Sequence, residues 1–382
     1  MAFAIKETAT HLISISKLLV LSYIIDWIFI IGIALIGYGF FKQPTNHHPF
    51  SLTDPTISYP HTQETVTTKT LLLVCLFAPA VLIFLGAWLL IPATATASTQ
   101  SPSTVPKPPA AKYIRRKFWE WNAGWMGLGL ALAGSWAATQ GLKVLVGKPR
   151  PDLLARCDPD LARIAEFTVG GLGDRVRGGA TLVSWEICRT TSKSLSRDGF
   201  ASFPSGHASF SFAGLIYLTL WLCSKFSVAF PYLPPYPVED QTHTDDRSSV
   251  RSRGAAPPVY LMLIVFVPTA TACFIAASRW FDFRHHGFDI LFGSAMGIFF
   301  AYIGFNMYHL PIRRGAGWAW GARSPRRAFL RGVGFPSSLG TDSWAFDTRR
   351  GFDLENAAMH GPYGGEHVKP ESSDGRQGRL QV

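Results

Sequence analysis

Residues 259–308 contain two long apolar stretches, VYLMLIVFVPTATACFIAAS (259–278) and FDILFGSAMGIFFAYIGFNMY (288–308), joined by the nine residues RWFDFRHHG (279–287). Each apolar stretch is close to the roughly 20 residues that a helix needs to cross a bilayer. The sequence therefore predicts two membrane helices. The charged and imidazole side chains between them would lie at one membrane surface, where such residues mark a functional site.

Four further apolar stretches precede these two, at approximately 18–41, 71–91, 121–142 and 208–223. Only 16% of the 382 residues are charged, against roughly 25% in a soluble domain. We therefore expect an all-α, polytopic membrane protein with six transmembrane helices. The stretch 121–142 is rich in Gly and Ala, which favours close contact between membrane helices.

Three parts are expected along the chain: an N-terminal segment (1–17), a membrane domain (18–310, with a catalytic core of about 121–308) and a basic tail (311–382). The tail has no apolar periodicity, so we expect it to be largely disordered. No cleavable signal peptide is evident. Cys157 and Cys188 share one polar loop and could form a disulfide if that loop faces an oxidising compartment.

The formal net charge is +11, but no nucleic-acid-binding module is evident, so we expect no nucleic-acid partner and favour binding to anionic lipid and phosphate. Alternation of six spans places both termini on one membrane face, with the loops after spans one, three and five on the other. The face that holds the termini carries Lys6, Lys17, the 112–117 cluster, Arg251, Arg253, Arg313 and Arg314. By the positive-inside rule this face is cytosolic.

The first polar cluster is KVLVGKPRPD (143–152), directly after the third span. Pro149 and Pro151 disfavour helical geometry in the residues before them, so the helix should end near Gly147. Lys143 and Arg150 then come from different backbone elements, which suits an anion with several oxygens. Taken alone, the cluster is better explained as a basic anchor beside the membrane.

The second cluster is FPSGH (203–207), at the start of the fourth span. Ser205 can cap the helix, and Gly206 allows a ligand to approach the backbone N–H groups of the first turn. His207 is placed to transfer a proton. Considered by itself, this motif is better explained as an ordinary helix start.

The third cluster is SRWFDFRHHGFD (278–289). If the sixth helix starts by His285, then His285 and Asp289 share one helix face, and the carboxylate can orient the imidazole for nucleophilic attack. His286, Arg284 and Asp282 are expected to be solvated interfacial residues. A metal site is disfavoured because nearby Lys and Arg side chains would repel a cation.

The three clusters together resemble the signatures of the type 2 phosphatidic acid phosphatase superfamily: Lys-x6-Arg-Pro (143–151), Pro-Ser-Gly-His (204–207) and Ser-Arg-x5-His-x3-Asp (278–289). The resemblance implies a six-helix bundle with His285 as the nucleophile that becomes a phosphohistidine, Asp289 orienting it and His207 as acid and base. It also implies phosphate binding by Lys143, Arg150, Ser205, Gly206 and Arg279. No metal and no other cofactor is expected.

Arg156-Cys157 and Asp198-Gly199-Phe200 are similar to the eukaryotic phosphatidate and diacylglycerol pyrophosphate phosphatases. The expected substrate is a lipid phosphate whose acyl chains stay in the bilayer. The site would face the lumen of the ER, Golgi or vacuole, or the cell exterior. A sphingoid-base phosphatase, a headgroup transferase, a catalytically silent lipid-binding protein and a transporter are the alternatives. The sequence carries no signal for an oligomeric state.

Overall fold

The structure is a computed structural model that describes residues 17–90, 110–173, 175–190, 194–229 and 256–312, together with residues 319, 323 and 329. The chain divides into two units, Met1–Trp320 and Gly321–Val382, and the account below concerns the first. Several expectations fall outside the described residues: the N-terminal segment before Lys17, most of the 93–111 linker, nearly all of the basic tail, and Lys6, Arg251, Arg253, Arg313 and Arg314.

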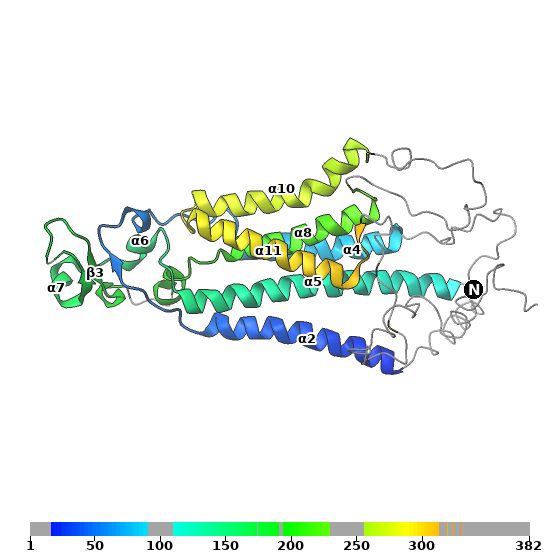
Figure 1. Ribbon diagram of the computed structural model, residues 1–382, viewed down its shortest axis with the longest axis horizontal. Coiled ribbons are helices and arrows are strands. Elements are labelled where there is room, and N and C mark those ends of the chain that lie inside the picture. Colours follow the sequence, from blue (N-terminus) through cyan, green and yellow to red (C-terminus); the bar gives the residue numbers. More distant parts are fainter. Residues whose placement is uncertain are drawn as a thin grey trace, which may run out of the picture. The chain divides into compact units, whose positions relative to one another are not determined.

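Long helices dominate the first unit (Figure 1). They are α2 (Lys17–Lys42), α3 (Thr68–Leu72) continued through a π-helical turn into α4 (Ala78–Leu89), α5 (Ala110–Val146), α8 (Gly206–Lys225), α10 (Val259–Phe281) and α11 (Gly287–Tyr308). Five helical segments in the described residues are long and apolar enough to cross a membrane: α2, the α3–α4 segment, α8, α10 and α11. The 37-residue α5 is not among them, so a count of six spans stays a prediction.

Two helix ends can be compared directly with the sequence. The helix α5 ends at Val146, as Pro149 and Pro151 predict. Gly147, which follows it, has a φ of +60°, a backbone conformation that glycine adopts without steric strain. The fourth span is longer than predicted, because α8 runs from Gly206 to Lys225 rather than from 208 to 223.

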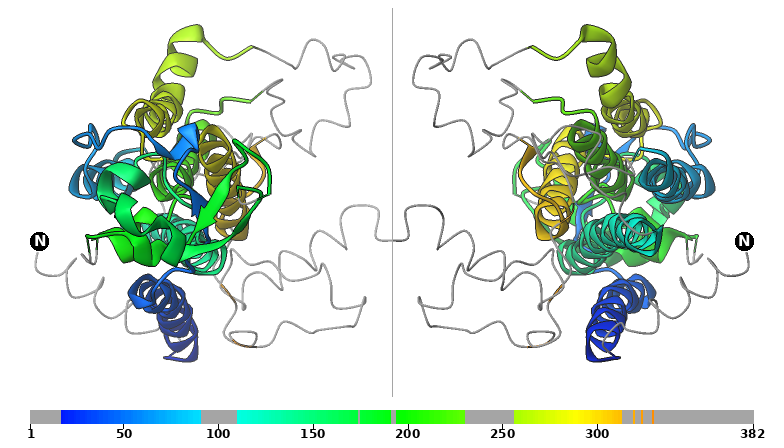
Figure 2. Two further views of the ribbon diagram at one scale, coloured as in Figure 1. Left: turned by 90° about the vertical axis from the view of Figure 1, so that its left-hand side faces the viewer. Right: turned by 90° about the vertical axis from the view of Figure 1, so that its right-hand side faces the viewer.

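The helices α8, α5 and α11 form the centre of the bundle, while α2 packs on α5 and α10 packs on α8 (Figure 2). Small residues allow the central contacts. A Cβ added at Gly127 of α5 would lie 2.7 Å from the carbonyl oxygen of Gly304 of α11. The buried Tyr217 of α8 donates a hydrogen bond to the carbonyl oxygen of Gly124, 2.8 Å away. The Gly- and Ala-rich composition of α5 therefore serves close packing, as predicted.

A small compact region caps one end of the bundle (Figure 1). It contains α6 (Leu153–Cys157), α7 (Ile164–Phe167) and an antiparallel sheet in the order β1 (Phe50–Ser51), β3 (Thr181–Val183), β2 (Thr168–Gly171). Its apolar core includes Phe50, Ile57, Leu153, Val183, Ile187 and Phe200. A disulfide joins Cys157 to Cys188, whose Cα atoms are 4.7 Å apart. This region closes over the end of the bundle where the three sequence motifs meet.

Candidate active site

A cavity of about 440 Å³ lies at the end of the bundle beside this small region. Its lining brings together residues from α2, α5, α8 and α10 and from the loops between them. Six of the eight site residues predicted from the sequence line it: Lys143, Arg150, Gly206, His207, Arg279 and His285. The predicted Ser205 and Asp289 are not in this lining.

The imidazole of His285 is held in one orientation. Its Nδ1 is 2.6 Å from the carbonyl oxygen of Ser202, and because a carbonyl only accepts, Nδ1 carries the proton. The lone pair is therefore on Nε2. Burial, followed by the charges of Arg150 and Lys143, lowers the pKa of His285 well below its usual value of 6.5. A neutral imidazole with a free Nε2 is the form that can act as a nucleophile.

Asp289 does not pair with His285 as the spacing predicted. The helix α11 begins at Gly287, so His285 precedes it and the i, i+4 relation does not apply. The Asp289 carboxylate instead accepts hydrogen bonds from the hydroxyl of Ser202 at 2.6 Å, from Lys148 at 2.7 Å and from the backbone N–H of His286 at 3.2 Å. Asp289 is thus linked to the imidazole of His285 indirectly, through Ser202, whose carbonyl oxygen accepts from His285.

Two arginines in the cavity wall are each fixed by a carboxylate. Asp198 accepts a hydrogen bond from Arg150 at 2.7 Å, and Asp282 accepts one from Arg279 at 2.8 Å. Burial alone would raise the pKa of Asp198, but the charges of Arg150 and Arg156 bring it below its usual value. A carboxylate that stays ionised holds its guanidinium in place and leaves the cavity side of the cation available to an anion.

Lys143 differs from these arginines, because among the described residues no carboxylate forms an ion pair with it. It faces the first turn of α8 across a narrow space, where a Cβ added at Gly206 would lie 3.4 Å from the Lys143 Nζ. A phosphoryl oxygen in this space could contact both the ammonium group and the helix N-terminus.

Ser205 has a structural role that the sequence left open. It is fully buried, it is the N-cap of α8, and its hydroxyl accepts a hydrogen bond from the backbone N–H of Ala208. Its own N–H donates to the carbonyl oxygen of Asp289, 3.0 Å away. The predicted helix cap is therefore confirmed, whereas the contact between the Ser205 hydroxyl and phosphate stays a prediction. Gly206 and His207 line the cavity.

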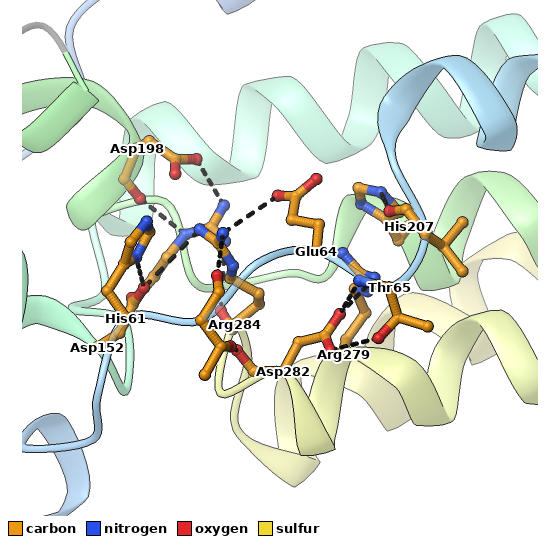
Figure 3. A network of polar contacts seen from close by, with 12 residues as sticks. His61, Glu64, Thr65, Asp152, Asp198, His207, Arg279, Asp282 and Arg284 are labelled. Carbon is orange, nitrogen blue, oxygen red and sulfur yellow. Dashed lines mark hydrogen bonds and ion pairs between the residues drawn. The ribbon is translucent and has the colours of Figure 1, made fainter.

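No pattern in the sequence predicted the segment 61–66, which belongs to the connection between α2 and α3 and crosses the site (Figure 3). The carbonyl oxygen of Val66 is 3.1 Å from Nε2 of His207, so Nε2 carries the proton and Nδ1 is free. Thr65 donates to Asp282 through its N–H at 2.9 Å and its hydroxyl at 2.7 Å. We call residues 61–66 the strap. It orients His207 directly and Arg279 through Asp282.

The expectation that Arg284 and Asp282 are solvated is wrong, because both are buried. Arg284 donates to the carbonyl oxygen of Thr62 in the strap at 3.0 Å, and it lies 3.8 Å from Glu64 and from Asp152 (Figure 3). A buried charge must be paired, and the partners of Arg284 lie far from it in sequence. Arg284 therefore ties the strap to the loop after α5.

Part of the cavity lining is apolar. Phe40 and Phe41 of α2, Leu71 and Leu72 of α3, Trp136 of α5 and Phe210 of α8 line it. Phe40 and Leu72 are also 41% and 39% exposed, so they belong both to the cavity and to the outer surface of the bundle. An amphipathic ligand can therefore place a charged group beside His285 and an apolar part between α2 and α3.

Comparisons with known proteins show which family the chain belongs to. Residues 124–313 match the model of the PAP2 superfamily. The chain is 30% identical over 264 residues to a probable diacylglycerol pyrophosphate phosphatase of Schizosaccharomyces pombe, a match that covers 69% of this chain and 72% of the relative.

The chain belongs to the PAP2 superfamily. It is also 27% identical over 289 residues to diacylglycerol pyrophosphate phosphatase 1 of Saccharomyces cerevisiae (75% of this chain, 80% of the relative). Lipid phosphate phosphatase 2 of Arabidopsis thaliana is 28% identical over 206 residues (54% and 58%). No solved structure matches significantly. PAP2 membership and the apolar helices make the chain an integral, multi-pass membrane protein.

The PAP2 match begins within α5, after α2, the strap and α4. The strap therefore precedes the matched region, although it bonds to His207, Asp282 and Arg284 within it.

Proposed function

We propose that this membrane phosphatase hydrolyses phosphatidate, related lipid phosphomonoesters and diacylglycerol pyrophosphate through a phosphohistidine at His285, without a divalent metal. The observation that carries the proposal is the free Nε2 of His285 in a cavity whose lining contains both cationic and large apolar side chains. The relatives named diacylglycerol pyrophosphate phosphatase and lipid phosphate phosphatase support the same substrate class.

In the first step, Nε2 of His285 attacks the terminal phosphorus. A P–N bond forms, the P–O bond to the leaving group breaks, and its electron pair stays on the leaving oxygen. Lys143, Arg150 and Arg279 stabilise the charge on the phosphoryl oxygens. Such positioning and charge neutralisation are the main requirements of phosphoryl transfer. When the leaving group is an alkoxide, the imidazolium form of His207 gives it the proton of Nδ1 and becomes neutral.

In the second step, water attacks the phosphorus of the phosphohistidine. His207 accepts a proton from this water, the P–N bond breaks, its electron pair returns to Nε2, and inorganic phosphate leaves. The strap supports this role, because the bond from Nε2 of His207 to the carbonyl oxygen of Val66 keeps Nδ1 free for proton transfer.

In this mechanism, fixed cations neutralise the phosphoryl charge that a metal ion neutralises in other phosphoryl-transfer enzymes. The donors of Arg150 and Arg279, together with Lys143, would repel Mg²⁺ from the space beside His285. Within the described residues, no group of three or more His, Cys, Asp or Glu side chains is arranged to hold a metal ion. The composition of the cavity wall therefore supports an anion site.

The decisive experiment compares wild type with His285→Ala in membranes that contain EDTA, with phosphate release measured on a panel of glycerol-based and sphingoid lipid phosphates. We expect wild-type activity on at least the glycerol-based lipids and less than about 0.1% of it in the variant. Acid-labile radiolabel retained on the wild-type chain after rapid quenching would identify the phosphohistidine.

Equal activity in the variant, or wild-type activity that disappears with EDTA and returns with Mg²⁺, would contradict the mechanism. The substrate panel also separates the alternatives. A preference for sphingoid phosphates would indicate a sphingoid-base phosphatase. Transfer of the phosphate group to an added alcohol would indicate a transferase, and binding without turnover would indicate a catalytically silent lipid-binding protein. We further propose that the site faces the lumen or the cell exterior, where the Cys157–Cys188 disulfide would be stable.

A further inference from the structure

A fourth cation lines the cavity, and the proposed mechanism does not use it. Arg197 belongs to the turn Ser194–Gly199, and it lies directly before Asp198, the partner of Arg150. Its guanidinium carbon is 3.9 Å from the ring centroid of Phe41 in α2, a distance typical of cation–π stacking. The stacking holds the guanidinium against an apolar residue of the same cavity lining.

Arg197 differs from the neighbouring arginines in having no carboxylate partner among the described residues. Arg150, Arg156, Arg279 and Arg284 each have a carboxylate within ion-pair distance. Across the described part of the chain, no carboxylate forms such a pair with Arg197. Arg197 also lies close enough to Lys143 for their like charges to repel. An additional anion at this position would relieve that repulsion.

In the proposed function, the attacked phosphorus would lie beside His285, and the acyl chains would extend toward the exposed Phe40 and Leu72. Phe41, on which Arg197 stacks, is next to Phe40 in α2. A leaving group bound between His285 and Phe40 would therefore lie near Arg197.

Leaving groups of two chemical kinds differ in their need for such a cation. Phosphatidate releases an alkoxide, which requires a proton. A pyrophosphate lipid releases a phosphate monoester, which is stable without a proton but keeps its negative charge beside the protein. A guanidinium group binds such an anion in a bidentate manner.

We propose that Arg197 is a second phosphate-binding residue, which holds the inner phosphate of a pyrophosphate lipid and favours such lipids over monophosphates. This inference rests on the proposed function and adds a specificity determinant to it. Arg197 binds the leaving group and takes no part in the attack of His285 on the terminal phosphorus.

The test compares diacylglycerol pyrophosphate with phosphatidate of the same acyl composition in identical mixed micelles. Arg197→Gln should lower kcat/KM for the pyrophosphate lipid about 10- to 100-fold, as expected for one lost charge-assisted contact. It should lower kcat/KM for phosphatidate no more than about threefold. Arg197→Lys, which keeps the charge but cannot bind two oxygens in the same plane, should give an intermediate value for the pyrophosphate lipid.

Arg175→Gln is the matched control, because it removes the same charge from an exposed site in the same small region. It should change neither value, which excludes a general effect of net charge on attraction to the micelle. Equal losses on both lipids in Arg197→Gln, or no loss on either, would overturn the proposal. If wild type hydrolysed neither lipid, the proposed function would fail instead.

A binding measurement separates these cases, because it needs no turnover. Methylenebisphosphonate should raise the thermal stability of wild type at lower concentration than methylphosphonate, and Arg197→Gln should abolish most of that difference. The same preference in wild type and Arg197→Gln would refute the assignment of the inner phosphate to Arg197, whatever the enzyme hydrolyses.

Discussion

The imidazole of His285 is fixed by a backbone carbonyl oxygen, and that carbonyl belongs to Ser202, whose hydroxyl donates to Asp289. A carbonyl cannot stabilise an imidazolium as strongly as a carboxylate does. It fixes the tautomer while leaving Nε2 a weaker base, which suits a nucleophile that must stay neutral among cations. Asp289 acts on this arrangement by holding the Ser202 loop against α11.

This arrangement predicts that Ser202 and Asp289 act as a unit. Ser202→Ala and Asp289→Asn should each lower kcat roughly tenfold or more with KM little changed, because both let the Ser202 carbonyl move away from His285. The double variant should be no worse than about the more damaged single variant. The measurement is the rate of phosphoenzyme formation in a single turnover.

Ser211→Ala is the control for this cycle. Its hydroxyl is also buried in the bundle but donates only to the carbonyl oxygen of Ala208 within α8, so its removal should leave the rate unchanged. Additive losses in the Ser202 and Asp289 double variant, or a harmless Ser202→Ala, would show that Asp289 reaches His285 by another route.

Sequence spacing located most of the residues around the cavity but not the contacts between them. His285 and Asp289 were assigned to one helix face, and a helix start two residues later than assumed removes that relation. Lys148 lies inside the first motif, yet nothing in its position indicated that it would pair with Asp289, 141 residues away. Pairing across such distances depends on how the loops fold.

Close contacts between helices of the bundle depend on glycines, which have no side chain. At Gly297 of α11, an added Cβ would lie 2.4 Å from the carbonyl oxygen of Ser209 and 2.7 Å from the Cβ of Phe212, both in α8. Neither atom is at the end of a flexible side chain, so α8 and α11 would have to separate. Because the start of α8 carries Gly206 and His207, a movement of α8 would also displace these two residues of the cavity lining.

Gly297→Ala should therefore lower stability by about 1–3 kcal/mol and reduce activity, whereas Gly32→Ala is the matched control. No atom lies within 4 Å of a Cβ added at Gly32 of α2, and alanine has the higher helix propensity, so this variant should be neutral or slightly stabilising. Thermal inactivation in detergent measures both. Equal midpoint temperatures of thermal inactivation for the two variants would contradict the close contact of α11 with α8.

Elements without a strong pattern were the ones that the sequence did not predict. The strands contain two to four residues, too few for alternation to emerge from composition. The strap has no apolar periodicity, and its contacts use backbone groups of Thr62 and Val66. By contrast, long apolar helices are recognised from composition alone, because the bilayer sets their length.

At the scale of the whole molecule, one end of the bundle holds the disulfide, the small sheet and the cavity. Labelling a residue of the small sheet therefore tests which membrane face the cavity lies on. In sealed microsomes whose cytosolic face is outward, a membrane-impermeant maleimide should label Ser98→Cys directly. It should label Gly170→Cys only after permeabilisation. Gly170 lies in β2, is exposed, and has open space for a side chain. Both variants are made in a Cys273→Ala background, which removes the exposed free thiol.

Direct labelling of Gly170→Cys in intact microsomes would reverse the proposed orientation and place the cavity in the cytosol. Both sites becoming accessible only after permeabilisation would contradict the alternation of spans. That result would also question whether the less apolar α5 crosses the membrane.

The strap also determines how much of the chain is needed for activity. The PAP2 match covers residues 124–313, but His207, Asp282 and Arg284 have their hydrogen-bond partners in residues 61–66. A fragment cut to the matched region would keep every motif residue. It would lose the Val66 carbonyl that orients His207, the Thr65 donors to Asp282, and the Thr62 and Glu64 partners of Arg284. We therefore expect the segment that carries the first two membrane helices and the strap to be required for activity, and a split of the chain near residue 100 should yield activity only when both pieces are present.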